Sequence, residues 1–105
     1  MCGIAGILNF EGKKTLNELV ELSEGLGHRG PDDEGFYVVH GSESKGTEYL
    51  GESSNKNLVN LKQITSSENT SFKLGLVHRR FSILDTSKLG HQPMLCDSED
   101  IILTF

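Results

Sequence analysis

The chain begins with the apolar sequence MCGIAGI at residues 1–7, in which glycines alternate with larger residues. This pattern predicts a strand from Ile4 to Phe10 whose backbone closely approaches another part of the molecule. Removal of the initiator Met1 would make Cys2 the N-terminal residue. A thiol and a free α-amino group would then lie on one residue at the start of a strand.

An N-terminal cysteine can combine a nucleophile with its own base. A free thiol has a pKa of about 8.5, whereas an α-amino group titrates at about 7.7–8.0 and is partly neutral near pH 7. The amine of Cys2 could accept the thiol proton directly or through a water, as in N-terminal nucleophile catalysis. Alternatively, Cys2 is a small apolar residue buried at the start of the strand.

The composition restricts the class of protein. With 105 residues and 11.5 kDa, the chain could form one small domain. Its net charge of −5 and pI of about 5.3 argue against nucleic acid and anionic membrane surfaces as partners. No signal peptide or membrane span is evident, so a cytoplasmic location is expected. Cys2 and Cys96 show no paired spacing, so neither a disulfide framework nor a metal site is predicted.

The first half of the chain predicts a helix between two strands. A helix is expected over Thr15–Leu26, because Thr15 and Glu18 have the spacing of a capping box and apolar residues follow at helical intervals. The segment HRGPDDEG at residues 28–35 predicts a loop, since it is rich in glycine, proline and charge. A strand is then expected over Phe36–His40.

The second half begins with a polar segment. Residues 41–71 are interpreted as a long insertion, part of which could be a hairpin, a helix or mobile. Strand-like sequence resumes over Phe72–Leu84, a turn is expected over Thr86–Gln92, and an apolar strand is expected over Ile101–Phe105. Because a domain rarely ends inside a buried strand, we expect the chain to be a fragment.

Four blocks of sequence, in this order, resemble the N-terminal glutaminase domain of glutamine-hydrolysing asparagine synthetases. The opening block alone resembles class II glutamine amidotransferases more generally. The later blocks select the synthetase branch, and outside 41–71 the resemblance covers nearly the whole chain. The blocks are MCGIAGI at 1–7, HRGPDDEG at 28–35, HRRFSILD at 78–85 and GHQPM at 90–94.

The resemblance implies both a fold and a reaction. The implied fold is α+β, the four-layer αββα sandwich of N-terminal-nucleophile hydrolases, of which only the first half would be present. Cys2 would attack the side-chain amide of glutamine to give a thioester and ammonia, and water would then release glutamate. In the full-length protein, the ammonia would amidate aspartate activated by ATP and Mg in a synthetase domain outside this chain.

The resemblance also assigns a substrate site. Arg80 matches the arginine that binds the α-carboxylate of glutamine, a task that suits the planar guanidinium fork. The segment Phe81, Ser82, Ile83 and Leu84 matches the backbone that lines the glutamine pocket. No cofactor is implied for this part of the protein.

Neighbouring charged residues have alternative interpretations. Arg79 alternates with Arg80 along a strand, so it is expected on the opposite face as a solvent or interdomain residue. His28 and Arg29 could either stabilise their loop, or act in pocket assembly or in ammonia passage to a second domain. Asp32 and Asp33 are interpreted as turn formers. Two further residues are expected to have no role in the chemistry, namely His78, packed in a strand, and Cys96, in a polar loop with no base nearby.

Some residues that the family uses are not found in this sequence. Relatives continue after the last strand with an Asn-Gly-Glu block that supplies the oxyanion hole, and each oxyanion donor contributes about 2.7–4 kcal/mol. The isolated 105-residue chain is therefore expected to be inactive. Three alternatives stay open for the full-length protein: a sugar acid as ammonia acceptor, a sugar phosphate as acceptor, or a non-catalytic interaction module. A homo-oligomer is also compatible with the sequence.

Overall fold

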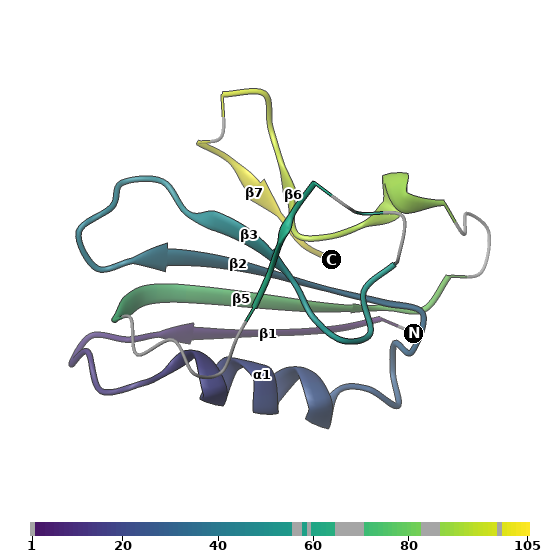
Figure 1. Ribbon diagram of the computed structural model, residues 1–105, viewed down its shortest axis with the longest axis horizontal. Helices are drawn as coiled ribbons and strands as arrows, with labels where there is room; N and C mark the ends of the chain where they lie inside the picture. The colour runs from purple at the N-terminus through teal and green to yellow at the C-terminus, as the bar shows by residue number, and fades with distance from the viewer. Residues whose placement is uncertain (1, 56–57, 59, 65–70, 83–86, 99) are drawn as a thin grey trace.

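The computed structural model describes residues 2–55, 58, 60–64, 71–82, 87–98 and 100–105. Strands dominate this part of the chain, and they are accompanied by one α-helix and one short 3₁₀ helix (Figure 1). The elements in chain order are β1 (Gly3–Leu8), α1 (Leu16–Gly25), β2 (Asp33–His40), β3 (Thr47–Leu50), β4 (Lys62–Gln63), β5 (Phe72–Arg80), η1 (Lys88–Gly90), β6 (Met94–Leu95) and β7 (Ile102–Leu103).

Five of the described strands form a mixed sheet in the order β1-β5-β2-β3-β4. Antiparallel pairing joins β1 to β5, β5 to β2 and β2 to β3, whereas β3 and β4 are parallel. Strand β5 therefore lies between the N-terminal strand β1 and the central strand β2. This order brings residues from three distant parts of the sequence together at one end of the sheet.

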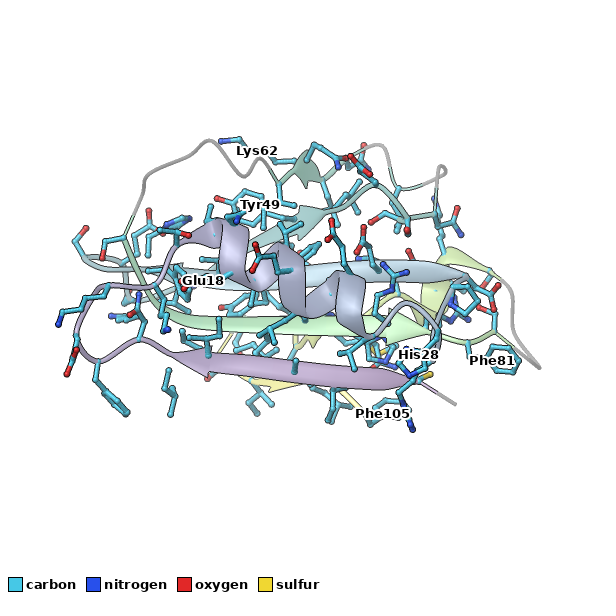
Figure 2. The ribbon with its side chains drawn as sticks, turned by 90° about the horizontal axis from the view of Figure 1, so that it is seen from below. Glu18, His28, Tyr49, Lys62, Phe81 and Phe105 are labelled. Atoms are coloured by element: carbon cyan, nitrogen blue, oxygen red, sulfur yellow. The ribbon has the colours of Figure 1, made fainter. Side chains whose placement is uncertain are left out.

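Helix α1 covers one face of this sheet (Figures 1 and 2). Thr15 is its N-cap, and the Thr15 N–H donates to Glu18 Oε2 at 2.8 Å, as the capping box predicts. The apolar side of the helix packs on alternate strand residues, which confirms the helical periodicity seen in the sequence. The buried cluster between helix and sheet comprises Leu16, Leu19, Phe36, Val38, Tyr49, Ile64, Phe72 and Val77.

The opposite face of the sheet is approached by the C-terminal segment. Strands β6 and β7 form an antiparallel hairpin on the side away from α1 (Figures 1 and 2). His78 Nε2 lies 2.9 Å from the Phe105 carbonyl oxygen, and the backbone at Gln92 passes so close to Gly35 that an added Cβ would lie 1.9 Å from the Gln92 oxygen. The observed architecture is thus a helix, a five-stranded sheet and a hairpin.

Several predicted boundaries differ from the structure. Strand β2 begins at Asp33, inside the segment predicted as loop, because residues 33–35 pair with β5 and β3. The apolar ends of two predicted strands lie outside regular structure and are exposed: Phe10 is 89% exposed and Phe105 is 66% exposed. Strand β5 ends at Arg80, and positions 83–84 lie outside the described residues.

The described residues of the segment 41–71, which the sequence predicts to be a polar insertion, contribute to the core. Strand β3 extends a hairpin from β2, as one of the alternatives had it, and β4 adds the outer edge of the sheet. Tyr49, Leu50 and Ile64 are each at most 9% exposed. These few apolar residues are enough to anchor a segment whose average composition is polar.

Candidate functional site

The strand register brings Cys2 and Arg80 together. Gly3 pairs with Arg79 across β1 and β5, so the next position on each strand places Cys2 beside Arg80. Side chains alternate between faces along a strand. Val77 and Arg79 face the helix, and Arg80 therefore faces the other side, together with Cys2. Both predicted residues occupy the same face and the same end of the sheet.

The thiol of Cys2 lies next to a backbone donor. The Phe81 N–H donates to Cys2 Sγ at 3.4 Å, and the residue is half-buried. An amide donor stabilises negative charge on the sulfur or on an atom bonded to it. The carbonyl oxygen of Cys2 accepts a hydrogen bond from Arg29 Nε at 3.3 Å. Both ends of the residue are thus positioned by segments distant in the sequence.

Arg80 is a buried cation at the end of β5, next to the position of Cys2. It is 7% exposed, and its Nη1 donates to the Ser87 carbonyl oxygen at 2.5 Å. Gly90 packs against the guanidinium so closely that an added Cβ would lie 2.3 Å from Cζ. The main chain at Ser87 and Gly90 thus contacts the guanidinium and restricts its orientation. A fixed planar guanidinium suits recognition of a planar carboxylate.

The segment predicted to line the pocket is only partly described. Phe81 contributes its N–H to Cys2, while its ring is 42% exposed and extends beyond the end of the sheet (Figure 2). The Ser82 N–H donates to Asp32 Oδ2 at 2.7 Å, so this donor is occupied within the protein. Ile83 and Leu84 lie outside the described residues.

The loop that precedes β2 contacts both Cys2 and the end of β5. The Asp32 N–H donates to the Arg80 carbonyl oxygen at 3.0 Å, and Arg29 holds the Cys2 carbonyl as described above. Gly30 lies against β5, where an added Cβ would be 2.3 Å from the Arg79 carbonyl carbon. Two of the functions that the sequence left open for Arg29, loop stability and assembly of the region around Cys2, are compatible with this geometry.

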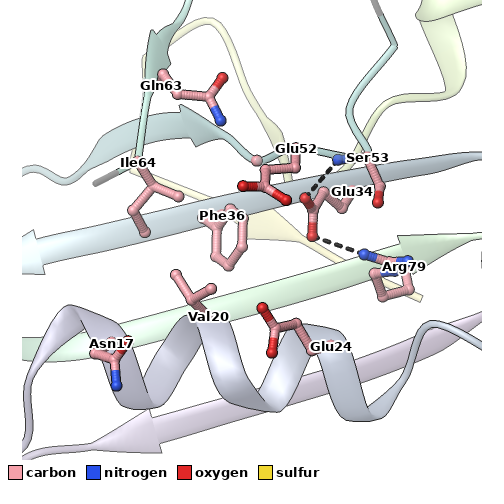
Figure 3. A pocket seen from close by; sticks show the side chains of 11 residues that line it. Asn17, Val20, Glu24, Glu34, Phe36, Glu52, Ser53, Gln63, Ile64 and Arg79 are labelled. Carbon is pink, nitrogen blue, oxygen red and sulfur yellow. Dashed lines mark hydrogen bonds and ion pairs between the residues drawn. The ribbon is translucent and has the colours of Figure 1, made fainter. Parts of the chain in front are cut away.

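Arg79 lies on the face opposite Arg80, as predicted, but it is buried and not a solvent residue. Its side chain is buried on the helix face, where Nη1 lies 2.8 Å from Glu34 Oε2 and Nε donates to the Gly30 carbonyl at 3.0 Å. Figure 3 shows this ion pair and the hydrogen bond that Glu34 accepts from the Ser53 N–H at 2.8 Å. Glu34 also accepts a hydrogen bond from the Ser23 hydroxyl at 2.5 Å. Burial is possible because each charge meets a partner and further hydrogen bonds.

Figure 3 shows a cavity of about 220 Å³ beside this ion pair. Its walls are α1, β2, β4 and the residues after β3, including Glu24, Phe36, Glu52 and Gln63. The cavity lies on the helix face of the sheet, whereas Cys2 and Arg80 lie on the other face. It is therefore separate from the predicted chemistry.

Asp33 is also not a turn former. It is 2% exposed in strand β2, and in the sheet register it pairs with Arg80. Its Oδ2 lies 2.7 Å from His91 Nδ1, and its Oδ1 accepts the Asn55 N–H at 2.8 Å. Sequence reasoning missed His91 and this contact, because the two residues are 58 positions apart and only the fold brings them together.

His78 is packed in β5, as predicted. It is 1% exposed, and burial lowers its pKa below the ordinary value of 6.5. A lowered pKa in the folded state means that the unfolded chain binds the proton more readily. The contribution of His78 to stability is therefore present above about pH 6.5 and is lost as the pH falls below this value.

We expect this loss to be visible in denaturation experiments. His78→Gln retains a donor for the Phe105 carbonyl but cannot titrate, so its free energy of unfolding should fall less between pH 7.5 and pH 5.5 than that of the unchanged protein. Urea denaturation at both pH values measures the difference. Equal losses in the two proteins would contradict the assignment.

Cys96 has closer polar neighbours than expected. Its Sγ lies 3.1 Å from both Ser98 Oγ and Asp100 Oδ1, so the prediction that no base is nearby is wrong. The hydrogen bond with the Ser98 hydroxyl lowers the pKa of the Cys96 thiol. The residue lies in the β6–β7 hairpin. Both Cys2 and Cys96 are free thiols.

Sequence comparisons relate this chain to known proteins. Residues 1–50 match the glutamine amidotransferase domain family, which confirms the resemblance noted in the opening block. The chain is also 33% identical, over 94 residues and 90% of its length, to a protein of Methanocaldococcus jannaschii named as a candidate glutamine-hydrolyzing asparagine synthetase. The chain spans only 13% of the length of that relative. No solved structure significantly matches this chain.

The one α-helix among the described residues, α1, is not long and apolar enough to cross a lipid bilayer. No group of three or more His, Cys, Asp or Glu side chains in the same part of the chain is arranged to hold a metal ion.

Proposed function

We propose that this chain carries the glutamine-hydrolysing site of a glutamine-dependent synthetase. The observation that supports this most strongly is the position of Cys2 beside Arg80, on one face and at one end of the sheet. A nucleophile next to a carboxylate-binding guanidinium fits an amino-acid substrate that is attacked through its side chain. The match to glutamine amidotransferase domains supports glutamine as that amino acid.

The proposed reaction starts after removal of Met1. The α-amine of Cys2 takes the thiol proton, Sγ attacks the amide carbon of glutamine, and collapse of the tetrahedral intermediate breaks the C–N bond. The protonated amine returns its proton to the leaving nitrogen, and ammonia departs. Water then attacks the thioester carbon, giving glutamate and restoring the thiol. The Phe81 N–H, 3.4 Å from Sγ, stabilises the anionic sulfur before the attack.

The finer parts of the proposal concern the full-length protein. In it, ammonia would be used to make asparagine, as in the activity that the name of the similar protein states. We further propose that aspartate is activated by ATP and Mg in a further domain, as the family resemblance implies. The helix, sheet and hairpin would be part of a four-layer αββα sandwich. The full-length protein would be located in the cytoplasm. The 105-residue chain alone would lack glutaminase activity, because it has no counterpart of the Asn-Gly-Glu block that supplies the oxyanion hole in the family that it resembles.

A glutamine-analogue electrophile provides the first test. The full-length protein should be labelled at Cys2 by 6-diazo-5-oxo-norleucine, and excess glutamine should protect it; Cys96 serves as the internal control thiol. Labelling of Cys96 without Cys2 would contradict the proposal and favour an interaction module. Glutamate release should then be measured with ATP and either aspartate, a sugar acid or a sugar phosphate, because the true acceptor is expected to raise turnover.

Arg80 provides a quantitative test of substrate recognition. Arg80→Lys keeps the charge but loses the paired geometry, and hydrogen bonds to charged groups contribute about 1.5–3 kcal/mol. We therefore expect the KM for glutamine to rise by about 10- to 100-fold, as measured by glutamate release. Lys73→Ala, which removes an exposed cation at the other end of β5, should leave the KM unchanged. An unchanged KM in Arg80→Lys would remove the carboxylate-binding role.

A further inference from the structure

The guanidinium of Arg80 rests against the main chain of residues 87–90. Nη1 donates to the Ser87 carbonyl oxygen at 2.5 Å. An added Cβ on Gly90 would lie 2.2 Å from Nη2 and 2.9 Å from Nε, so this glycine packs directly on the guanidinium. The location of residues 87–90 therefore determines where the charged fork of Arg80 lies.

One side chain at the end of this segment fastens it to the sheet. His91 Nδ1 lies 2.7 Å from Asp33 Oδ2, and the two side chains are 9% and 2% exposed. Asp33 is held in turn by the Asn55 N–H, which donates to its other oxygen at 2.8 Å. The next residue, Gln92, packs its carbonyl oxygen against Gly35. The contact between Asp33 and His91 is thus made at the point where the segment crosses β2.

The register places this contact next to Arg80. Asp33 and Arg80 are cross-strand partners in β2 and β5, and partners in an antiparallel pair project from the same face. Asp33 binds His91, Gly90 precedes His91, and Gly90 packs on Arg80. Two contacts, joined by the Gly90–His91 peptide bond, therefore connect a buried carboxylate to the orientation of the neighbouring guanidinium.

We propose that Asp33 and His91 are positioning residues that set the Arg80 guanidinium for binding of the α-carboxylate of glutamine. This inference rests on the proposed function and adds two residues to its substrate site. Donation from His91 Nδ1 needs no positive charge, because a neutral imidazole with its proton on this nitrogen also donates. The pair acts on substrate binding and not on the thiol, since neither residue contacts Cys2.

Loss of the contact between Asp33 and His91 should affect the KM for glutamine and not kcat. An interaction with the α-carboxylate is made equally in the bound substrate and in the transition state, so its loss raises KM and leaves kcat nearly unchanged. Loss of His91 frees residues 87–90 from the sheet and also leaves the Asp33 carboxylate beside Arg80 without its imidazole partner. Both changes weaken the attraction between Arg80 and the substrate carboxylate.

The test uses glutaminase kinetics of the full-length protein. His91→Ala should raise the KM for glutamine by about 10-fold with kcat within about twofold. His91→Asn, whose Nδ2 can occupy the place of the imidazole Nδ1, should restore the KM to within about threefold of the original value. His40→Ala is the matched control, because His40 bonds the Tyr49 hydroxyl at 2.8 Å at the other end of β2. It should leave the KM unchanged.

A double variant tests whether the effect passes through Arg80. In an Arg80→Lys background, His91→Ala should change the KM by less than about twofold. A full 10-fold effect in that background would overturn the inference. So would a loss of kcat at constant KM, or an equal rise of KM in His40→Ala.

Binding of the product separates this inference from the proposed function. Calorimetry with glutamate, which has the same α-carboxylate, should show weaker binding to His91→Ala and restored binding to His91→Asn. If the unchanged protein binds glutamate with this pattern but releases no ammonia from glutamine, the proposed function fails and the positioning role stands. If glutamine is hydrolysed and His91→Ala behaves like the unchanged protein in both assays, the positioning role fails alone.

Discussion

Cys2→Ala is expected to abolish glutamate formation from glutamine in the full-length protein. The substitution removes the sulfur that forms the thioester and leaves the strand and its pairing with β5 intact. Loss of a covalent nucleophile costs several orders of magnitude in rate in enzymes of this type, so we expect a decrease of at least about 1,000-fold. The measurement is glutamate released per protein, with free ammonia as a separate nitrogen source for the acceptor reaction.

The design contains its own controls. Synthesis from free ammonia should continue in Cys2→Ala, because the variant removes only the release of ammonia from glutamine. Cys96→Ala, which removes the other free thiol, should retain glutaminase activity. Substantial turnover by Cys2→Ala would assign the chemistry to another residue. The mass of the native protein should show that Met1 is absent, since a retained Met1 would block the amine.

Arg79→Leu is expected to be the most destabilising single substitution among the charged residues discussed above. It leaves the Glu34 carboxylate buried without its cation, and removal of one partner from a buried ion pair costs about 3–5 kcal/mol. This is a large fraction of the usual stability of a domain, about 5–15 kcal/mol. The decrease in the free energy of unfolding can be measured by urea denaturation.

Two comparisons show whether the buried charge is the cause. Arg79→Leu with Glu34→Leu removes both charges and should be less destabilised than Arg79→Leu alone, because no unpaired charge is then buried. Lys13→Ala breaks the ion pair of Lys13 with Glu11, whose side chains are 80% and 75% exposed, and should cause no measurable change. A double variant as unstable as the single one would mean that packing, not charge, dominates.

The elements that sequence reasoning predicted well depend on local patterns. The capping residues Thr15 and Glu18 mark the start of α1, and the apolar periodicity marks its buried face. Strands β1 and β5 were expected within a few residues of their ends. These features could be predicted because hydrogen-bonding patterns and side-chain periodicity within one element depend mainly on neighbours in the sequence.

The wrong predictions concern residues whose environment comes from distant segments. The sequence predicts Arg79 as a solvent or interdomain residue, yet Glu34 and Gly30 supply partners that make its burial within this sheet possible. Asp33 has the composition of a turn residue, yet pairing with β5 places it in a strand, and His91 reaches it from 58 residues away. The polar segment 41–71 supplies Tyr49 and Ile64 to the core. Local composition cannot predict partners of this kind.

The sequence by itself determined which chemical groups this protein offers: a cysteine at position 2, an arginine at position 80, and a capped helix with one apolar face. Only the tertiary structure decided their relationship. The antiparallel register of β1 and β5 places Cys2 beside Arg80, and the contact of His91 with Asp33 places the main chain against the guanidinium. The physical reason is that residue type and local periodicity are encoded at each position, whereas register and burial arise from packing between segments distant in the chain.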